Sequence, residues 1–363
     1  MSAPTPKPGI LVIPPYVPGK AKAPGFAAPI KLSANENALG CSPAAQRAYR
    51  EAQADLHLYP DPNVTELRAA LAARHAIEPS RIVFGTGSDE IFSMVCQAYL
   101  EPGDNIVQPV HGFAAWAIAA RAAGAIVKSS PERDYTADVD ALLADVDERT
   151  RIVFIANPAN PSGTCVPFAE IVRLHAGLRP NVLLLLDSAY VDFARAMLHP
   201  DEDLDLARRN ENVIVTRTFS KLHGLAALRI GWGYAAQPIV DALGRIRLPF
   251  NVSRPAHAAA IAALEDEDFV ERSIAHTEAG RASLARDLAR LGLEPVPSAS
   301  NFVTARFPPG ARLTAAEAEK RLAERGILVR WLGNYAMPDC IRVTIGAEAH
   351  MARLLAELET LLL

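Results

Sequence analysis

The chain has 363 residues, of which 50% are hydrophobic and 21% are charged, and its formal net charge at pH 7 is -4. This length suggests one large domain with a smaller one beside it, and the composition is that of an ordinary globular protein. The small net charge and the lack of dense lysine or arginine blocks argue against a nucleic-acid partner.

The cysteines and the start of the chain bear on where the protein works. Four cysteines lie far apart without a C-x-x-C pair, so we expect neither a disulfide framework nor a metal site. The proline-rich opening lacks the cationic start and apolar core of a signal peptide, and no later apolar run approaches the ~20 residues that span a bilayer. We therefore expect a soluble, cytoplasmic protein without a membrane partner.

Residues 1–30 are predicted to form an extended N-terminal arm, because their prolines fix φ and remove backbone donors. Such an arm lies on a protein surface, and that of a partner subunit is one candidate. We place a large domain at residues 31–250 and a small domain at residues 251–363, with part of residues 31–55 near the small domain.

Between residues 80 and 220, short apolar runs alternate with longer helical patterns. Continuous apolar strands separated by helices are typical of a mostly parallel sheet that is covered on both faces. The pattern predicts an α/β domain. Its strands are expected at residues 81–84, 105–108, 125–130, 151–156, 181–193 and 212–219, and its clearest helices at residues 89–100 and 113–124.

From about residue 250 the pattern changes to a long amphipathic helix, approximately residues 254–291. Short strands and helices then alternate, which indicates a smaller α+β domain that the arm completes. The predicted strands are residues 301–307, 327–331 and 340–346, with a helix at 315–326 and another at the end of the chain.

A glycine-rich turn, "GTGSDE" at residues 85–90, joins a predicted strand to a predicted helix. Backbone amides and the helix dipole favour an anion at such a place, so Ser88 and Asp89 are candidates for a phosphate site. The turn is not the dinucleotide fingerprint, because Glu90 stands where the third glycine would be. A plain turn without a ligand is the competing interpretation.

Two further segments place polar groups after buried strands. By itself, "NPANPSG" at residues 157–163 is only a proline turn. Asp187 ends the run "VLLLLD", at the edge where open α/β sheets bind ligands, and Tyr190 lies near the same edge. A helix cap or a loop charge would explain Asp187 equally well.

One lysine, Lys221, follows Ser220 inside the stretch "TRTFSKLHGLAALRIGWG" at residues 216–233. Lysine is seldom fully buried without a partner, so Lys221 is either a surface residue at a turn or an amine that does chemistry. Pyridoxal 5'-phosphate requires an amine, an acid for its ring nitrogen, donors to its phenolate oxygen and a phosphate seat. Together with Arg229, the segments above supply all four.

In their order along the chain, the motifs resemble the fold type I pyridoxal-phosphate aminotransferases, and among them the histidinol-phosphate aminotransferase family. The resemblance covers nearly the whole chain and implies an aspartate-aminotransferase-like fold with a seven-stranded, mostly parallel sheet. The motifs are "PYVPGK" (15–20), "KLSANENALGCSP" (31–43), "LYPD" (58–61), "GSDE" (87–90), "NPANPSGT" (157–164), "LDSAYVDF" (186–193), "TRTFSK" (216–221), "LRIGW" (228–232) and "IRVTIG" (341–346).

The resemblance implies a catalytic role for three residues. Lys221 would bind the cofactor covalently and, once released, carry a proton. Asp187 would face the ring nitrogen of the cofactor. Tyr190 would bond the phenolate oxygen of the cofactor together with Asn160.

The remaining cofactor contacts are also implied by the resemblance. Tyr59 would reach in from the neighbouring subunit, which makes a homodimer the active unit. His111 stands where many relatives stack an aromatic ring on the cofactor, although a histidine held in a loop is the alternative. His223 lies close enough to the lysine in sequence to influence substrate choice. The residues around the cofactor phosphate would be Ser88, Asp89, Ser220 and Arg229.

Substrate recognition is expected from the small domain and the arm. Arg342 resembles the arginine that grips an α-carboxylate, to which a guanidinium donates two hydrogen bonds. Arg330 and Tyr16 match positions that hold the substrate phosphate, with Tyr16 coming from the arm of the other subunit. An isolated arginine is otherwise usually a surface charge. Asn35 is a further candidate for contacting the substrate.

These roles predict an aminotransferase that moves an amino group between L-histidinol phosphate and 2-oxoglutarate or glutamate in histidine biosynthesis. An aromatic amino-acid aminotransferase is the main alternative, and a phosphoamino-acid decarboxylase is a weaker one. A regulatory module that binds the cofactor without turnover is disfavoured, because Lys221, Asp187 and Arg229 are retained. The short arm also has no room for a DNA-binding domain.

Overall fold

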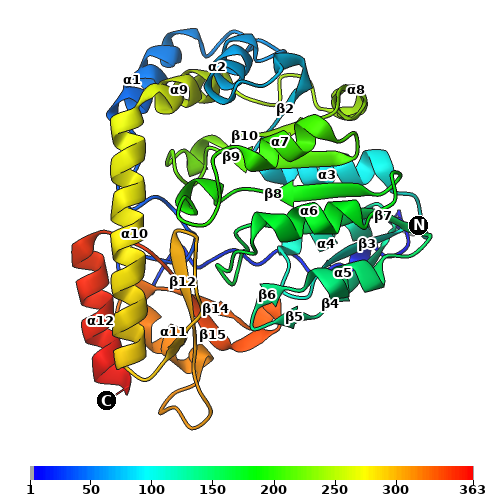
Figure 1. The fold of residues 1–363 in the computed structure, drawn as a ribbon. Coiled ribbons are helices and arrows are strands. Elements are labelled where there is room, and N and C mark those ends of the chain that lie inside the picture. Colours follow the sequence, from blue (N-terminus) through cyan, green and yellow to red (C-terminus); the bar gives the residue numbers. More distant parts are fainter. Residues whose placement is uncertain (1–3, 363) are drawn as a thin grey trace.

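A seven-stranded sheet forms the centre of the larger of two domains in the computed structural model, which describes residues 4–362 (Figure 1). Its strand order is β2-β10-β9-β8-β7-β3-β4, and neighbours are parallel except where β10 pairs with β2 and β9. The predicted α/β fold class is confirmed. The strands are β2 (Ile82–Gly85), β3 (Asn105–Pro109), β4 (Ile126–Ser130), β7 (Thr150–Ala156), β8 (Leu183–Asp187), β9 (Val213–Thr218) and β10 (Gly231–Ala235).

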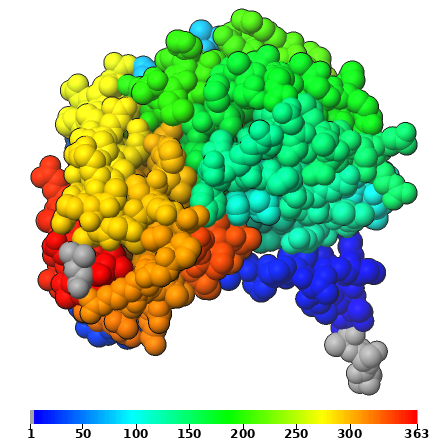
Figure 2. Space-filling view, turned by 60° about the horizontal axis from the view of Figure 1, so that its bottom comes forward, coloured from blue at the N-terminus to red at the C-terminus, as the bar shows by residue number. Residues whose placement is uncertain are grey.

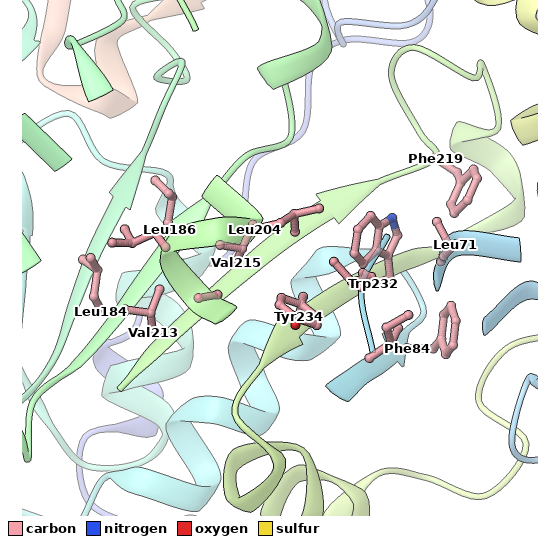
Figure 3. Packing of buried hydrophobic residues seen from close by; sticks show 14 of the residues in the cluster. Leu71, Phe84, Leu184, Leu186, Leu204, Val213, Val215, Phe219, Trp232 and Tyr234 are labelled. Carbon is pink, nitrogen blue, oxygen red and sulfur yellow. The ribbon is translucent and has the colours of Figure 1, made fainter. Parts of the chain in front are cut away.

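Helices cover both faces of this sheet, and the side chains of its central strands are almost all buried. In β8, Leu184 and Leu186 join one buried cluster, whereas Leu183 and Leu185 join the other, as the two-residue period of a strand requires. Figure 3 shows the first cluster, in which the leucines of β8 lie beside valines of β9. The first face packs on α1 (Pro43–Glu51), α2 (Thr65–His75), α5 (Val139–Asp145), α6 (Phe168–Ala176), α7 (Glu202–Arg209) and α9 (Arg254–Glu265), and the second on α3 (Ser88–Tyr99), α4 (Ala114–Ala122) and α8 (Gln237–Ile246).

The strand β10 was not predicted from the sequence. Two of its five residues are glycines, which lack the β-branched side chains that signal a strand. The structure needs one of them, because a Cβ on Gly231 would lie 2.4 Å from the backbone nitrogen of Ser88. Glycine is thus the reason why β10 was missed in the sequence, and it is also what allows the start of α3 to lie directly against β10.

The long helix predicted at residues 254–291 is two helices, α9 and α10 (Glu267–Arg290). They are separated at Asp266, whose side chain accepts a hydrogen bond from the backbone N–H of Phe269 and caps α10. Four alanines of α9 belong to the core of the large domain, whereas Leu284 and Leu288 of α10 belong to that of the small domain. We propose that the domain boundary lies at Asp266, whereas the sequence analysis placed it near residue 250.

The small domain has an antiparallel sheet in the order β11-β12-β15-β14. A short strand that follows the arm, β1 (Ile30–Lys31), pairs in parallel with β13 (Ile327–Leu328), so the start of the chain completes this domain. Residues 1–3 of the predicted arm and residue 363 lie outside the described residues. The other elements are β11 (Glu294–Pro295), β12 (Phe302–Arg306), β14 (Arg330–Leu332), β15 (Met337–Thr344), α11 (Ala315–Ala323) and α12 (Glu348–Leu362).

The arm projects from the body of the molecule beneath the large domain, as the blue segment in Figure 2 shows. It contains one 3-10 turn, η1 (Ile10–Val12), in which Leu11 is 82% exposed. No helix within residues 4–362 is both long and apolar enough to cross a membrane. The remaining short elements are η2 (Ala52–Asp55), η3 (Pro79–Arg81), β5 (Glu132–Arg133), β6 (Thr136–Ala137), η4 (Val191–Phe193), η5 (Ala226–Leu228) and η6 (Gly333–Tyr335).

Candidate active site

A cavity of about 420 Å³, which we call the site cavity, lies at the carboxyl end of β8 and is lined by both domains and the arm. All of the predicted site residues line it except Tyr59 and His111. Those that do are Tyr16, Asn35, Ser88, Asp89, Asn160, Asp187, Tyr190, Ser220, Lys221, Arg229, Arg330 and Arg342.

Asp187 is the last residue of β8, and its carboxyl group is buried. Its Oδ1 accepts hydrogen bonds from the backbone N–H of Ala189, at 3.2 Å, and from the hydroxyl of Thr216, at 3.3 Å. Burial, helped by the negative charge of Asp89, raises the pKa of Asp187 to about 7. Both of its partners are neutral, so a bound cation would favour the ionised form.

Lys221 lies in the turn that follows β9. Its Nζ donates a hydrogen bond to the backbone oxygen of Ala34 at 3.4 Å and lies 5.8 Å from the centre of the Tyr190 ring. Burial, with the positive charge of Arg342, lowers the pKa of this amine to about 8. An amine with so low a pKa is a nucleophile near neutral pH.

Tyr190 and Asn160 present polar groups to the same cavity. The ring of Tyr190 packs edge-on against Phe302, 5.4 Å between centroids, and its hydroxyl accepts a hydrogen bond from Asn35 at 2.8 Å. Burial raises the pKa of this phenol to about 12. The side-chain oxygen of Asn160 accepts a hydrogen bond from Arg342, which leaves the amide N–H groups of Asn160 for another acceptor.

The N-terminus of α3 and the side chain of Arg229 form a seat for an anion. Gly87, just before the helix, has a φ of 84°, and a Cβ there would lie 2.5 Å from Nη2 of Arg229. Ser88 begins the helix and, like Ser220, is buried. The free N–H groups of the first helical turn attract an oxyanion, as does the guanidinium. The carboxylate of Asp89 pairs with Arg229 at 3.2 Å, so it orients that guanidinium.

Comparison with known proteins agrees with this geometry. Residues 27–358 match the profile of the family described as aminotransferase class I and II. The chain belongs to this family. Histidinol-phosphate aminotransferase 1 of Caulobacter vibrioides is 57% identical over 94% of this chain and 95% of its own length. The histidinol-phosphate aminotransferase of Maricaulis maris is 47% identical over 98% of both chains.

Among solved structures, the histidinol-phosphate aminotransferase of Sinorhizobium meliloti in complex with pyridoxal-5'-phosphate has a TM-score of 0.91 and 31% identity to this chain. The match covers 99% of this chain and 98% of that one. The predicted membership of the histidinol-phosphate aminotransferase family is therefore confirmed.

In this aminotransferase, Arg330 ties the arm to the small domain. Its guanidinium donates hydrogen bonds of 2.6 Å to the backbone oxygens of Val17 and Pro18. Tyr16 consequently lies in the cavity of its own chain, 6.1 Å from Phe113 between ring centroids. Within the single chain, Arg330 holds the arm beside this cavity, and a contribution of Tyr16 to the cavity of the other subunit stays a prediction.

Arg342, on β15, is buried beside Asn160. It also donates to the backbone oxygen of Ser33, at 3.2 Å. Within residues 4–362 its Nε finds no hydrogen-bond partner. A buried N–H group without a partner is costly, so this edge of the guanidinium suits an incoming acceptor such as a carboxylate.

Two predicted residues lie outside the site cavity. Tyr59 is 80% exposed and stacks on Phe250, with ring centroids 4.5 Å apart, so its part in a neighbouring subunit stays a prediction. The Nδ1 of His111 lies 2.7 Å from a carboxylate oxygen of Glu132. Phe113 lines the site cavity and His111 does not, so the stacking role of His111 stays a prediction.

Several wall residues were missed by the sequence analysis. Phe113 stands at the end of "HGF", a motif from which the sequence analysis selected only His111, whereas Tyr335 carries no motif at all. His223 does not line the site cavity and cannot contact a substrate there. It lines a second cavity of about 380 Å³, which we call the rear cavity, together with Arg217, Asp201, His75 and Trp232.

Proposed function

We propose that this chain is a histidinol-phosphate aminotransferase that uses pyridoxal 5'-phosphate to move an amino group between L-histidinol phosphate and 2-oxoglutarate. The observation that carries the proposal is the meeting of a half-buried amine, Lys221, and a buried carboxyl group, Asp187, with an anion seat in one cavity. Relatives that bear this name match almost the whole length of the chain.

The residues of the site cavity fit this cofactor. Asp187 is a buried acid with two neutral partners, so a protonated ring nitrogen would supply the cation that it lacks. The amine of Lys221 makes one long hydrogen bond within the described structure and is available for a covalent bond. Gly87 has a φ of 84°, a conformation that residues with a side chain rarely adopt, and it stands directly before the helix whose first N–H groups would meet a phosphate.

When bound, pyridoxal 5'-phosphate supplies an electrophilic carbon and a ring that accepts electrons. Lys221 would hold the cofactor covalently and, once free, would take and return one proton. Asp187 would keep a negative charge opposite the ring nitrogen, which would strengthen the pull of the ring on electrons. Tyr190 and Asn160 would donate hydrogen bonds to the phenolate oxygen.

Different residues of the site cavity would bind the substrates and the phosphate of the cofactor. Arg342 has a free Nε–H and would hold the carboxylate of glutamate. Arg330 uses two of its five N–H donors on the arm, and the others would meet the phosphate of the substrate beside Tyr16. Ser88, Asp89, Ser220 and Arg229 would surround the cofactor phosphate.

We also propose a homodimer that works in the cytoplasm. Tyr59 is largely exposed and its ring is remote from the cavity of its own chain, which supports a contribution to a neighbouring cavity. Mixing a Lys221→Ala subunit with a Tyr59→Ala subunit tests this, because only shared sites would regenerate one intact cavity per mixed dimer. If the mixture stays as inactive as its components, the sites are not shared.

An aromatic amino-acid aminotransferase remains a second candidate, because three aromatic side chains besides Tyr190 line the site cavity. Tyr16, Phe113 and Tyr335 would pack against a phenyl ring as well as against an imidazole.

The decisive experiment mixes the purified holoenzyme with one amino donor at a time and follows the absorbance of the bound cofactor. We expect L-histidinol phosphate and glutamate to convert it, and phenylalanine to do so more slowly. Faster conversion by phenylalanine would overturn the substrate assignment, and no conversion by any amine would overturn the proposed activity.

A further inference from the structure

Asn35 forms hydrogen bonds with all of its polar groups. Its backbone N–H donates to the hydroxyl of Thr344 at 2.9 Å, and its side-chain oxygen accepts the proton of the same hydroxyl at 3.2 Å. Its backbone oxygen accepts from Asn301 at 2.9 Å, and its side-chain nitrogen donates to the hydroxyl of Tyr190 at 2.8 Å. Only 2% of Asn35 is exposed, so this network is closed to water.

The hydroxyl of Thr344 determines which way the amide of Asn35 faces. It accepts the backbone N–H of Asn35 and has one proton of its own to donate, which the side-chain oxygen of Asn35 takes. Turning the amide over would remove that acceptor from a buried hydroxyl, a loss of about 1–3 kcal/mol. The amide nitrogen therefore faces Tyr190.

The orientation of Asn35 has a consequence for the single proton of Tyr190. Because the phenol oxygen accepts a hydrogen bond from Asn35, its own O–H points elsewhere. Tyr190 lines the site cavity, and its ring is fixed edge-on against Phe302. The proton is thus directed into the cavity, where the bound cofactor lies under the proposed function.

We propose that Asn35 is a positioning residue, which turns the hydroxyl proton of Tyr190 toward the cofactor, and that Thr344 fixes Asn35 in the orientation that does so. The proposal rests on the proposed function, since it needs a cofactor in the site cavity. Thr344 lies on β15 of the small domain, whereas Tyr190 follows β8 of the large domain. The small domain therefore sets the direction of a proton that the large domain carries.

A double-mutant cycle with Asn35→Asp and Tyr190→Phe tests this coupling. The readout is the pH midpoint of the absorbance change of the bound cofactor in wild type, both single variants and the double variant. A carboxylate at position 35 only accepts, so Tyr190 would donate to it and withdraw its proton from the cavity. Losing that donor destabilises the deprotonated, anionic form of the cofactor and raises the midpoint.

We expect Asn35→Asp to raise the midpoint by about one pH unit more in wild type than in the Tyr190→Phe background, since a hydrogen bond to a charged group contributes about 1.5 kcal/mol. The direct effect of the new charge is present in both backgrounds and cancels. If the midpoint shifts of the two single variants add up to the shift of the double variant within about 0.3 pH unit, the proposal is overturned. Asparagine and aspartate both tolerate the φ of 59° at this position, so the variant keeps the backbone.

A second pair of variants tests Thr344, which does not line the site cavity. Thr344→Ser keeps the hydroxyl and should leave the midpoint unchanged, whereas Thr344→Val removes it and should raise the midpoint. Equal midpoints for the two variants would contradict the role of Thr344. If wild type showed no cofactor absorbance, the proposed function would fail, whereas normal absorbance with an additive cycle would refute only the role of Asn35.

Discussion

The site cavity and the rear cavity have similar volumes, about 420 and 380 Å³, and both contain buried charged side chains. In the rear cavity, Arg217 uses all three of its nitrogens on the carboxylates of Asp203 and Asp201. In the site cavity, Lys221 makes one hydrogen bond of 3.4 Å, and the Nε of Arg342 finds none within the described residues. The charged nitrogens of the rear cavity are therefore paired with carboxylates, whereas those of the site cavity are left with few or no partners.

The pKa values of the two cavities express this difference. Burial by itself would lower the pKa of Arg217, but the charge of Asp203 outweighs it and raises the pKa above its ordinary value. For Lys221, burial and the charge of Arg342 act together, and the pKa falls to about 8. Breaking a buried ion pair destabilises a fold because one charge loses its partner, whereas a buried charge that has no partner already costs stability and marks a candidate ligand site.

The largest effect is expected from Lys221→Ala, which removes the unpaired amine. Turnover should fall by at least ~10⁴-fold, because one group serves both as nucleophile and as proton carrier. The cofactor-free protein should unfold at the same or a higher temperature, since a poorly solvated amine is lost. Steady-state kinetics and thermal unfolding measure the two quantities, and wild-type turnover in this variant would refute the assignment of the site.

The opposite response is expected in the rear cavity. Asp203→Asn should lower the free energy of unfolding by about 3–5 kcal/mol, because it leaves Arg217 buried without its main partner. The absorbance of the bound cofactor should remain. Urea unfolding measures the loss, for which the exposed pair Arg290 and Glu359 offers a matched control: Glu359→Gln should cost under about 1 kcal/mol.

The two cavities should also respond to pH with opposite signs. The pKa of Asp187 is raised from 3.8 to about 7, so its stabilising protonated form is present at low pH and is lost as the pH rises through that interval. In the cofactor-free protein, Asp187→Asn should remove a decline of up to about 4 kcal/mol between these pH values. Urea unfolding at a series of pH values measures this, and an unchanged decline would contradict the burial of Asp187.

Asp201 provides the comparison in the rear cavity. Burial alone would raise its pKa, but the hydrogen bond from His75 and the charge of Arg217 outweigh burial and lower the pKa. The stability that Asp201 contributes is therefore present at neutral pH and is lost as the pH falls. Asp201→Asn should destabilise the protein at pH 7 more than at pH 3, the reverse of Asp187→Asn.

The smallest effect is expected from Arg330→Ala, which removes the guanidinium that holds the arm. The kcat/KM for L-histidinol phosphate should fall about 10- to 100-fold more than that for phenylalanine, because only the former carries a phosphate. Arg330→Lys keeps the positive charge without the forked guanidinium, so its kcat/KM for L-histidinol phosphate should lie between those of wild type and Arg330→Ala. Equal losses for both substrates would show that Arg330 only anchors the arm to Val17 and Pro18.

Much of the large domain was predictable, because its strands are apolar runs bounded by turns. The exceptions have local causes: β10 contains glycines, and α9 ends at a cap, Asp266, that interrupts no hydrophobic pattern. The hairpin of β5 and β6 was also missed, since its turn residues Asp134 and Tyr135 both have positive φ without being glycine. Such conformations depend on tertiary contacts that a sequence does not display.

The site cavity was predictable wherever a residue belonged to a motif with its own chemistry, as Lys221 and Asp187 do. Proximity in the cavity agrees with these predictions, although the roles of the residues stay predictions. Tyr335 was missed because a tyrosine on a short turn resembles any other aromatic residue. The position of Tyr16 beside the cavity of its own chain was not predicted, since the hydrogen bonds that hold the arm there involve backbone oxygens, and its part in another subunit stays a prediction.

The two glycines at the anion seat restrict how the enzyme can be redesigned. Gly87 has a φ of 84°, which residues with a side chain rarely adopt, and a Cβ at Gly231 would strike the backbone of Ser88, so substitution libraries at either position should yield inactive clones. Tyr335 and Phe113 line the site cavity and are not part of the anion seat. Selection for new amine donors should therefore randomise these two positions and leave the glycines of the anion seat unchanged.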